Sequence, residues 1–256
     1  TILIIDFYII SLILIITSFS ILIISILNYK YLNSLNNSDI SNFKPLISVL
    51  IPARNEEKSI IRCLNSLKNQ DYPNIEILVL DDNSTDNTNY VVHKYIQDQP
   101  NMRLLNGEDL PNGWIGKHWA CNQLSSNAKG DFILFLDADT AIKKETINTT
   151  FSQMQLQNAE LLTTIPLKKP RCLAEKLLFP FIDWITLALL PIKLSQKLNN
   201  SYLSLTFGQF MLFNKDAYSS IGGHKEIKNN ILDDFNLGRM IKKNGYKWML
   251  IDGTRS

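Results

Sequence analysis

The sequence predicts an α/β protein with a mostly parallel, Rossmann-like sheet flanked by helices and an N-terminal transmembrane helix. Three observations predict it. Residues 7–28 form an uncharged, apolar run. Between residues 46 and 136, β-rich runs alternate with segments of helical periodicity, an order typical of parallel sheets covered by helices. Residues 132–136 are continuously apolar, as in a strand buried on both faces.

The N-terminal run is long enough to cross a bilayer as a helix. The alternative is a cleavable signal peptide, which has a shorter apolar core, a basic segment before it and small residues after it. Here Asp6 precedes the run and Asn28-Tyr29-Lys30-Tyr31 follows it. These flanks favour a membrane anchor over residues 1–30.

The flanking charges predict the orientation of the anchor. Lys30 and Lys44 lie on its C-terminal side, so the positive-inside rule places the rest of the chain in the cytoplasm, at the cytoplasmic membrane. Residues 31–45 are polar and read as a linker, and residues 46–256 as one globular domain. Because the chain starts with Thr1 and stops just after a strand, we expect it to be a fragment.

The elements of the globular domain follow from short-range patterns. Apolar residues at helical spacing predict helices over 56–69 and 86–97, and a third from Leu232 to Asn244. The runs rich in β-branched and large apolar residues predict strands over 46–51, 75–80, 102–105 and 132–136. In parallel sheets of this kind, ligands bind beyond the carboxyl ends of the strands.

Composition narrows the classes of partner. The 256 residues are 45% hydrophobic and 20% charged, so a sizeable core can form. A net charge of +2 without a dense basic stripe argues against nucleic acid as a partner. Three cysteines without metal-ligand spacing indicate free thiols. The three histidines show no ligand spacing either, and we interpret them as structural.

Polar residues follow the first two predicted strands. Pro52, Arg54 and Glu56 belong to the loop after the first strand, and Asp81-Asp82 open the loop after the second. A turn with Asp86 capping the next helix explains part of the second loop. It does not require two adjacent carboxylates at the sheet edge. There, a carboxylate can accept a hydrogen bond from a nucleoside base.

The third carboxylate signal comes directly after the buried strand. Asp137 and Asp139 flank one alanine, and in an extended chain they point to the same side. Two carboxylates so placed repel each other unless a cation lies near them. Hard oxygen ligands suit Mg²⁺ or Mn²⁺, which also hold diphosphates.

In this order and spacing, the segments PARNEE, DDNSTDNT and DADT resemble the family-2 glycosyltransferases with the GT-A fold. The resemblance covers about residues 46–252. It implies that Asp82 contacts the nucleotide base, that Asp137 and Asp139 hold the metal and the donor diphosphate, and that the PARNEE loop contributes to donor binding.

Further segments narrow the resemblance. Residues 113–121 (GWIGKHWAC), 208–213 (GQFMLF) and 221–224 (IGGH) are similar to a subgroup associated with hopanoid and carotenoid pathways. By this resemblance, Lys117 lies near the donor phosphates. Without the motif, the same lysine reads as a solvated surface residue.

Asp233 and Asp234 begin the last predicted helix. Taken alone, the pair reads as an N-cap, since aspartate is favoured at helix starts. The family has a Glu-Asp pair here, and its second acid is the general base. The resemblance therefore assigns Asp234 as the base and places Asp233 beside it in the catalytic site. We expect an inverting displacement in which Asp234 takes the proton of an acceptor hydroxyl.

One apolar stretch, residues 173–194, is broken by Pro180, Asp183 and Pro191. It reads equally as a helix in the membrane interface or as a buried helix pair. An interfacial helix would suit a lipid acceptor.

The resemblance implies hexose transfer from a nucleotide-sugar, with UDP-sugar expected, to a lipid such as a hopanoid or carotenoid. Two alternatives stay open. One is a nucleotidyltransferase on a similar fold, although PARNEE lacks the glycines and basic residues of its first loop. The other is a non-catalytic, membrane-bound module that binds nucleotides.

Overall fold

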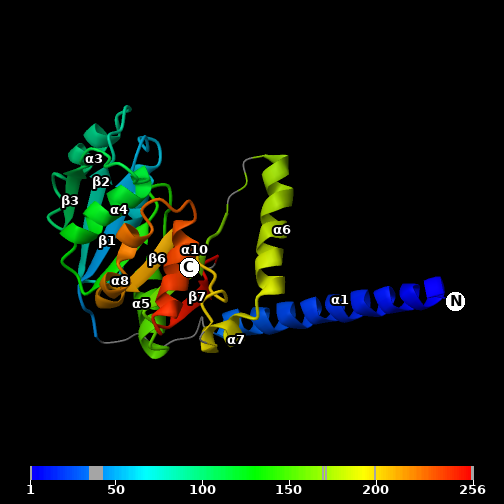
Figure 1. Cartoon of the computed structure of the whole chain (residues 1–256). Coiled ribbons are helices and arrows are strands. Elements are labelled where there is room, and N and C mark those ends of the chain that lie inside the picture. Colours follow the sequence, from blue (N-terminus) through cyan, green and yellow to red (C-terminus); the bar gives the residue numbers. More distant parts are fainter. Residues whose placement is uncertain (1, 35–42, 169, 171, 199, 255–256) are drawn as a thin grey trace. The chain divides into compact units, whose positions relative to one another are not determined.

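The protein is described by a computed structural model that covers residues 2–34, 43–168, 170, 172–198 and 200–254. Its contacts divide the chain into two compact units (Figure 1). The helical unit comprises Thr1–Asn37 with Leu167–Leu198, and the sheet unit comprises Ser38–Pro166 with Asn199–Ser256. Each unit is described by itself.

The sheet unit is built on a seven-stranded sheet with the order β3-β2-β1-β4-β6-β5-β7. Five of the strands are fully or almost fully buried, which matches their apolar sequences. The strands are β1 Ile47–Ala53, β2 Ile75–Asp81, β3 Met102–Asn106, β4 Phe132–Leu136, β5 Leu161–Ile165, β6 Phe210–Asn214 and β7 Trp248–Asp252.

Helices connect the strands of this unit. Those in the first half follow the predicted alternation, and those in the second half lie around β6 and β7. They are α2 Ile60–Lys68, α3 Thr88–Ile96, α4 Gly116–Asn127, α5 Thr146–Leu156, α8 Lys215–Ser220, α9 Gly223–Glu226 and α10 Asp233–Lys243.

The predicted sheet is confirmed, with one strand against the common direction. β1 pairs in parallel with β2 on one side and with β4 on the other, so the carboxyl ends of all three lie at one edge. β6 runs antiparallel to both β4 and β5. The mostly parallel sheet that the sequence predicts is therefore a mixed one in its second half.

The predicted elements match closely in the first half of the chain. The strand expected over 132–136 is β4 itself. The helix expected over 56–69 starts later, at Ile60, because Glu56 to Ser59 form a turn in which Ser59 N–H donates to the Glu56 carbonyl. Asn55, just before this turn, has a φ of 58°, a left-handed conformation that no helix continues.

The described residues of the helical unit form three helices: α1 Ile2–Ser34, α6 Leu173–Leu189 and α7 Ile192–Lys197. Within α1, residues Asp6–Leu32 are long and apolar enough to cross a membrane. The helix continues to Ser34, so it includes the start of the predicted linker 31–45. The linker residues 35–42 lie outside the described part of the chain.

The position of α6 contradicts two expectations from the sequence. One is that residues 46–256 form a single globular domain, and the other is that the stretch 173–194 is a buried helix pair. Its contacts are with α1, which is why residues 167–198 separate from the globular domain predicted over 46–256. Ala188 is the buried side chain of α6 among the described residues. Large apolar side chains are instead exposed, including Leu173, Leu177, Phe181 and Trp184. The alternative of a buried helix pair is therefore wrong.

Candidate functional site

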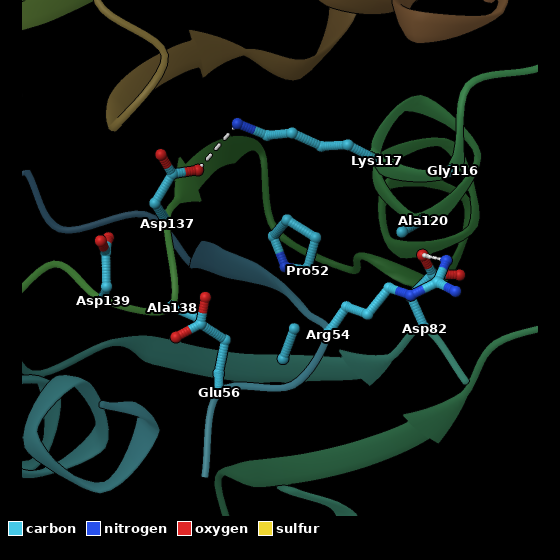
Figure 2. Close-up of a pocket in the computed structure, with 11 residues that line it drawn as sticks. Pro52, Arg54, Glu56, Asp82, Gly116, Lys117, Ala120, Asp137, Ala138 and Asp139 are labelled. Atoms are coloured by element: carbon cyan, nitrogen blue, oxygen red, sulfur yellow. Dashed lines mark hydrogen bonds and ion pairs between the residues drawn. The ribbon is translucent and has the colours of Figure 1, made fainter. Parts of the chain in front are cut away.

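A cavity of about 470 Å³ lies where β1, β2 and β4 end (Figure 2). It brings together the donor-site and metal-site residues expected from the sequence. Because these three strands are neighbours in the sheet, the loops after them converge. The lining residues are Pro52, Ala53, Arg54, Glu56, Asp82, Gly116, Lys117, Ala120, Asp137, Ala138 and Asp139.

The first two loops are tied to each other by hydrogen bonds. The Asn55 side-chain oxygen accepts from the Thr85 N–H at 2.8 Å, and the Asn55 N–H donates to Ser84 Oγ at 3.0 Å. Asp86 Oδ1 accepts from the Thr88 N–H at 2.9 Å, although α3 has Asn87 at its N-cap. Asn55 and Asp86 therefore shape the loops that carry the lining residues.

The structure separates the two adjacent aspartates after β2. Asp81 is used internally, since its carboxylate accepts from Asn89 Nδ2 at 3.0 Å and from the Ser84 N–H at 3.3 Å. Asp82 instead lines the cavity, with its Oδ2 3.6 Å from Arg54 Nη1. Only Asp82 is thus placed to meet a ligand there.

Asp82 sits in a partly desolvated position. Burial raises the pKa of its carboxyl group, and the Arg54 guanidinium opposes this rise. A Cβ atom at position 116 would lie 3.2 Å from Asp82 Oδ2, so Gly116 leaves room beside the carboxylate. The oxygen can accept a hydrogen bond from a flat, N–H-bearing group such as a nucleotide base.

Lys117, in the first turn of α4, connects two carboxylates. Its Nζ lies 2.9 Å from Asp137 Oδ1 and 3.9 Å from Asp233 Oδ2. Burial disfavours the charged amine, but these two carboxylates outweigh it, and the pKa of Lys117 is raised. Lys117 is therefore cationic at neutral pH and available to a phosphate at the cavity wall.

The Asp137-Ala138-Asp139 segment forms a turn. The Thr140 N–H donates to the Asp137 carbonyl at 2.9 Å, so the extended geometry expected for the two aspartates is wrong: the chain bends as soon as β4 ends. Both carboxylates still lie at one flank of the cavity, with the Lys117 ammonium against Asp137 (Figure 2).

The two carboxylates differ in their surroundings. Burial raises the pKa of Asp137, and Lys117 opposes the rise. Asp139 is exposed, and its carboxylate has no hydrogen bond or ion pair among the described residues. Asp139 therefore has both oxygens available for a cation.

These donors fit a hard divalent cation. The described part of the chain contains no cluster of three His, Cys, Asp or Glu side chains that could enclose a metal. Mg²⁺ in phosphate-handling sites is typically bound by one or two carboxylates, with substrate phosphates and water completing the shell. Asp139 and Asp137 can supply that protein share.

Asp233 and Asp234 occupy the first turn of α10, where Leu232 is the N-cap residue and makes no side-chain cap. The N-cap interpretation of the pair is therefore wrong. Asp234 Oδ2 accepts from the Gly208 N–H at 3.1 Å, and its Oδ1 accepts from the Phe235 N–H at 2.7 Å. Neither aspartate lines the cavity, but Lys117 joins Asp233 to it.

Asp234 is half-buried, and burial raises the pKa of its carboxyl group. The backbone N–H groups of Phe235 and Gly208 oppose this rise, and the neighbouring Asp233 adds to it. A carboxylate with a raised pKa is a stronger base than one with the ordinary pKa.

Two buried histidines stand behind this pair. His118 Nε2 lies 3.8 Å from Asp233 Oδ2, while its Nδ1 is 3.3 Å from the Lys228 carbonyl. His224 Nδ1 is 2.7 Å from the Tyr218 hydroxyl, and burial lowers the pKa of His224 to about 3. His224 is therefore neutral and structural, as the sequence predicts.

The contact of His118 with Asp233 was not visible in the sequence. The two residues are far apart in the chain, and no spacing rule links them. The only indication in the sequence was that His118 follows Lys117, which its motif had marked as a candidate site residue.

Comparisons with known proteins identify relatives of this chain. The model of "Glycosyl transferase family 2" matches residues 48–222. A 4,4'-diaponeurosporenoate glycosyltransferase of Staphylococcus aureus (strain USA300) is 31% identical over 196 residues, which are 75% of this chain and 50% of that protein. The same figures hold for the protein of strain NCTC 8325 / PS 47. This chain thus spans about half the length of these curated relatives.

Two solved structures share the fold. The mannosyltransferase PcManGT from Pyrobaculum calidifontis, in complex with GDP-Man and Mn²⁺, has a TM-score of 0.65 at 19% identity, covering 94% of this chain and 66% of that chain. S. aureus TarS 1-349 in complex with UDP-GlcNAc has a TM-score of 0.54 at 24% identity, covering 80% of this chain and 55% of that chain.

Proposed function

Because the chain belongs to glycosyl transferase family 2 and has the GT-A fold that the sequence predicts, we propose that it transfers a hexose from a nucleotide-sugar, a UDP-sugar, to a membrane lipid. One observation carries the proposal. Asp82, Lys117, Asp137 and Asp139 line one cavity, which therefore combines an acceptor for a base with charges for a diphosphate.

On the donor side, each residue has a separate task. Asp82 accepts a hydrogen bond from the base, and Pro52, Arg54 and Glu56 form the wall around the nucleoside. Lys117 faces the phosphates. Asp139, with Asp137, holds Mn²⁺ or Mg²⁺, which offsets the charge on the leaving diphosphate. The Mn²⁺ in the PcManGT structure supports a divalent metal in this fold.

On the acceptor side, Asp234 acts as the general base and Asp233 lies beside it. The acceptor oxygen bonds to the anomeric carbon, the bond from that carbon to the diphosphate oxygen breaks, and Asp234 takes the hydroxyl proton. The raised pKa of Asp234 suits this task. Lys117, which touches both Asp137 and Asp233, links the donor half of the site to the acceptor half.

Two observations support a lipid acceptor. The S. aureus relatives are named for 4,4'-diaponeurosporenoate, which agrees with the carotenoid-associated subgroup expected from the sequence. In the helical unit, α6 exposes Leu177, Phe181 and Trp184. Exposed apolar faces of this kind mark membrane or partner contacts.

The relatives' name also favours a second acceptor chemistry. The suffix of 4,4'-diaponeurosporenoate denotes a carboxylate. A carboxylate attacks without losing a proton, so Asp234 would then have no base role. Activity of Asp234→Asn with a hydroxyl lipid and with a carboxylate lipid separates the two acceptor classes.

We further propose that α1 anchors the chain in the cytoplasmic membrane, with the sheet unit in the cytoplasm. The apolar segment Asp6–Leu32 and the lysine at its C-terminal end support this placement. The chain should sediment with membranes, and a chain shortened to begin at Ser41 should do so less. Trimming of the sheet unit by protease added outside intact cells would overturn the orientation.

The function is tested by incubating the full chain with UDP-hexoses and membrane lipid extract, with and without Mn²⁺. We expect a glycolipid and free UDP, both dependent on the metal. Release of hexose 1-phosphate instead would identify transfer of the nucleotidyl group, the reaction of a nucleotidyltransferase. UDP binding without any turnover would identify a non-catalytic module.

A further inference from the structure

A second cavity, of about 510 Å³, lies in the helical unit between the C-terminal end of α1 and α7. Its volume is within the range of small-molecule sites. Its walls combine apolar side chains with three lysines, one from α1 and two from α7. The lining residues are Leu27, Asn28, Lys30, Tyr31, Pro191, Lys193, Leu194 and Lys197.

The charge of this pocket is uncompensated. None of its lining residues is acidic. Among the described residues, no carboxylate lies within ion-pair distance of Lys30, Lys193 or Lys197; the acidic Asp183 of this unit pairs with Lys168 instead. Lys193 Nζ lies 5.9 Å from the centroid of the Tyr31 ring, which holds it over the pocket side of α1. Three lysines among the lining residues of one cavity provide positive charge that attracts an anion.

Asn28 builds the pocket. It is 2% exposed, although it belongs to an apolar helix. Its Nδ2 donates to the carbonyls of Leu187 and Leu190, both at 2.7 Å, and its Oδ1 accepts from the Ile192 N–H at 2.9 Å. These bonds satisfy backbone groups at the junction of α6 and α7, so they hold α7 against α1. A buried amide is costly unless it is bonded in this way.

The pocket lies where a bilayer would end. The segment of α1 that is apolar enough to cross a membrane is Asp6–Leu32, and Lys30 lies near its C-terminal limit. Lysines at such positions extend to the headgroup level. Leu27 precedes Lys30 on α1, toward the middle of the apolar segment, so the pocket lining combines positive charge with apolar surface.

From this arrangement we propose that the pocket binds the phosphate headgroup of an anionic membrane lipid. The lysines neutralise the phosphate, and the apolar wall accommodates the first part of an acyl chain. The inference rests on the proposed placement of α1 in the membrane. It does not depend on the chemistry proposed for the sheet unit.

The test uses the full chain in nanodiscs of phosphatidylcholine that contain phosphatidylglycerol. Native mass spectrometry after partial delipidation counts the retained lipids. We expect wild-type protein to retain phosphatidylglycerol in preference to phosphatidylcholine. Each Lys→Gln change should weaken retention about fivefold, and the triple variant Lys30→Gln, Lys193→Gln, Lys197→Gln on the order of 100-fold. Lys176→Gln, on α6 outside the pocket, is the matched control.

A second variant separates a built pocket from diffuse charge. Asn28→Leu keeps all three lysines but removes the bonds that hold α7, so retention should fall. Unchanged retention in Asn28→Leu or in the triple variant would overturn the proposal, as would equal retention of both lipids by the wild type. Displacement by excess inorganic phosphate would show a site for free anions instead. Donor hydrolysis, measured in parallel, reports on the sheet unit alone.

Discussion

Two pairs of aspartates in the sheet unit, Asp137 with Asp139 and Asp233 with Asp234, differ in their structural surroundings. Asp137 and Asp139 follow a buried strand on a turn, and Asp139 is exposed with no partner for its carboxylate among the described residues. Asp233 and Asp234 begin a helix, and Asp234 is half-buried with two backbone N–H donors. Asp139 thus offers open oxygens, whereas the oxygens of Asp234 are fixed by backbone donors.

The difference shows how position alone separates two carboxylate chemistries. An exposed carboxylate at a cavity can give its oxygens to a cation. A desolvated carboxylate has a raised pKa and is suited to accept a proton. Lys117 lies between the pairs, at 2.9 Å from Asp137 and 3.9 Å from Asp233, and its positive charge opposes the repulsion between these two carboxylates. If the two pairs have separate roles, substitutions in them should have separate effects.

The largest effect is expected for Asp139→Ala. This change removes the open carboxylate, so the metal is lost. The charge on the leaving diphosphate is then no longer offset. Several kcal/mol of transition-state stabilisation correspond to a loss of transfer on the order of 10³-fold or more. Single-turnover transfer with Mn²⁺ measures it. Asp131→Ala, an exposed aspartate at the other end of β4, is the control. Full activity with unchanged metal dependence would contradict the assignment.

Asp234→Asn tests the other pair. Asparagine keeps the size of the side chain and one oxygen that can accept from Gly208, so the fold and donor binding should persist. Transfer to a hydroxyl acceptor should fall on the order of 10²–10⁴-fold, the usual share of a positioned base. UDP affinity and melting temperature are measured beside single-turnover transfer.

Asp233→Asn is the matched change one residue earlier, and we expect it to be milder. Near-normal transfer by Asp234→Asn would leave the site without a named base for hydroxyl acceptors. A large loss in Asp233→Asn alone would move the role to that residue, which Lys117 and His118 contact.

How much of the fold and of the candidate site could be predicted depends on how far apart in the sequence the interacting residues lie. β4 and its aspartates were readable because a continuous apolar run ending in two acids is a local signal. That Asp82, Lys117 and Asp137 lie at one site could be predicted, because ligands bind beyond the carboxyl ends of parallel strands and the family motifs follow those strands. The ion pair of Lys117 with Asp233 was not readable, because it depends on how α10 packs.

The apolar stretch 173–194 shows a case in which the sequence could not distinguish two structures. Its composition suited a buried helix pair as well as a membrane surface, because both environments select the same side chains. Only the exposure of residues such as Phe181 and Trp184 distinguishes them. The lysine pocket of the helical unit was equally hidden, since Lys30 is distant in sequence from Lys193 and Lys197.

The pH dependence of transfer distinguishes the pairs in another way. A base must be ionised, and burial raises the pKa of Asp234 above its ordinary value of about 3.9. The acidic limb of kcat/KM should therefore begin above that value and fall about tenfold per pH unit below the pKa. The residual activity of Asp234→Asn should lack this limb. A wild-type profile that stays flat to pH values below about 4 would contradict the base role.

The smallest effect is expected at a third pair, Asp81 and Asp82, and it bears on donor binding alone. Asp82→Ala removes an acceptor for the base N–H, and a lost hydrogen bond to a buried partner costs about 1–3 kcal/mol. UDP affinity, measured by titration calorimetry with Mn²⁺, should fall roughly 5- to 150-fold, with a smaller change in single-turnover rate.

Asp82→Asn then identifies which contact matters. Its amide oxygen still accepts a hydrogen bond, so affinity should recover in part if the base is the partner. If Asp82 acted only through its ion pair with Arg54, whose side chain is 60% exposed, neither variant would change affinity by more than about fivefold, since such pairs contribute little. Asp98→Ala, an exposed aspartate outside the cavity, is the control. Equal affinity in Asp82→Ala and wild type would remove Asp82 from the donor site, and the metal-side pair would then account for donor binding by itself.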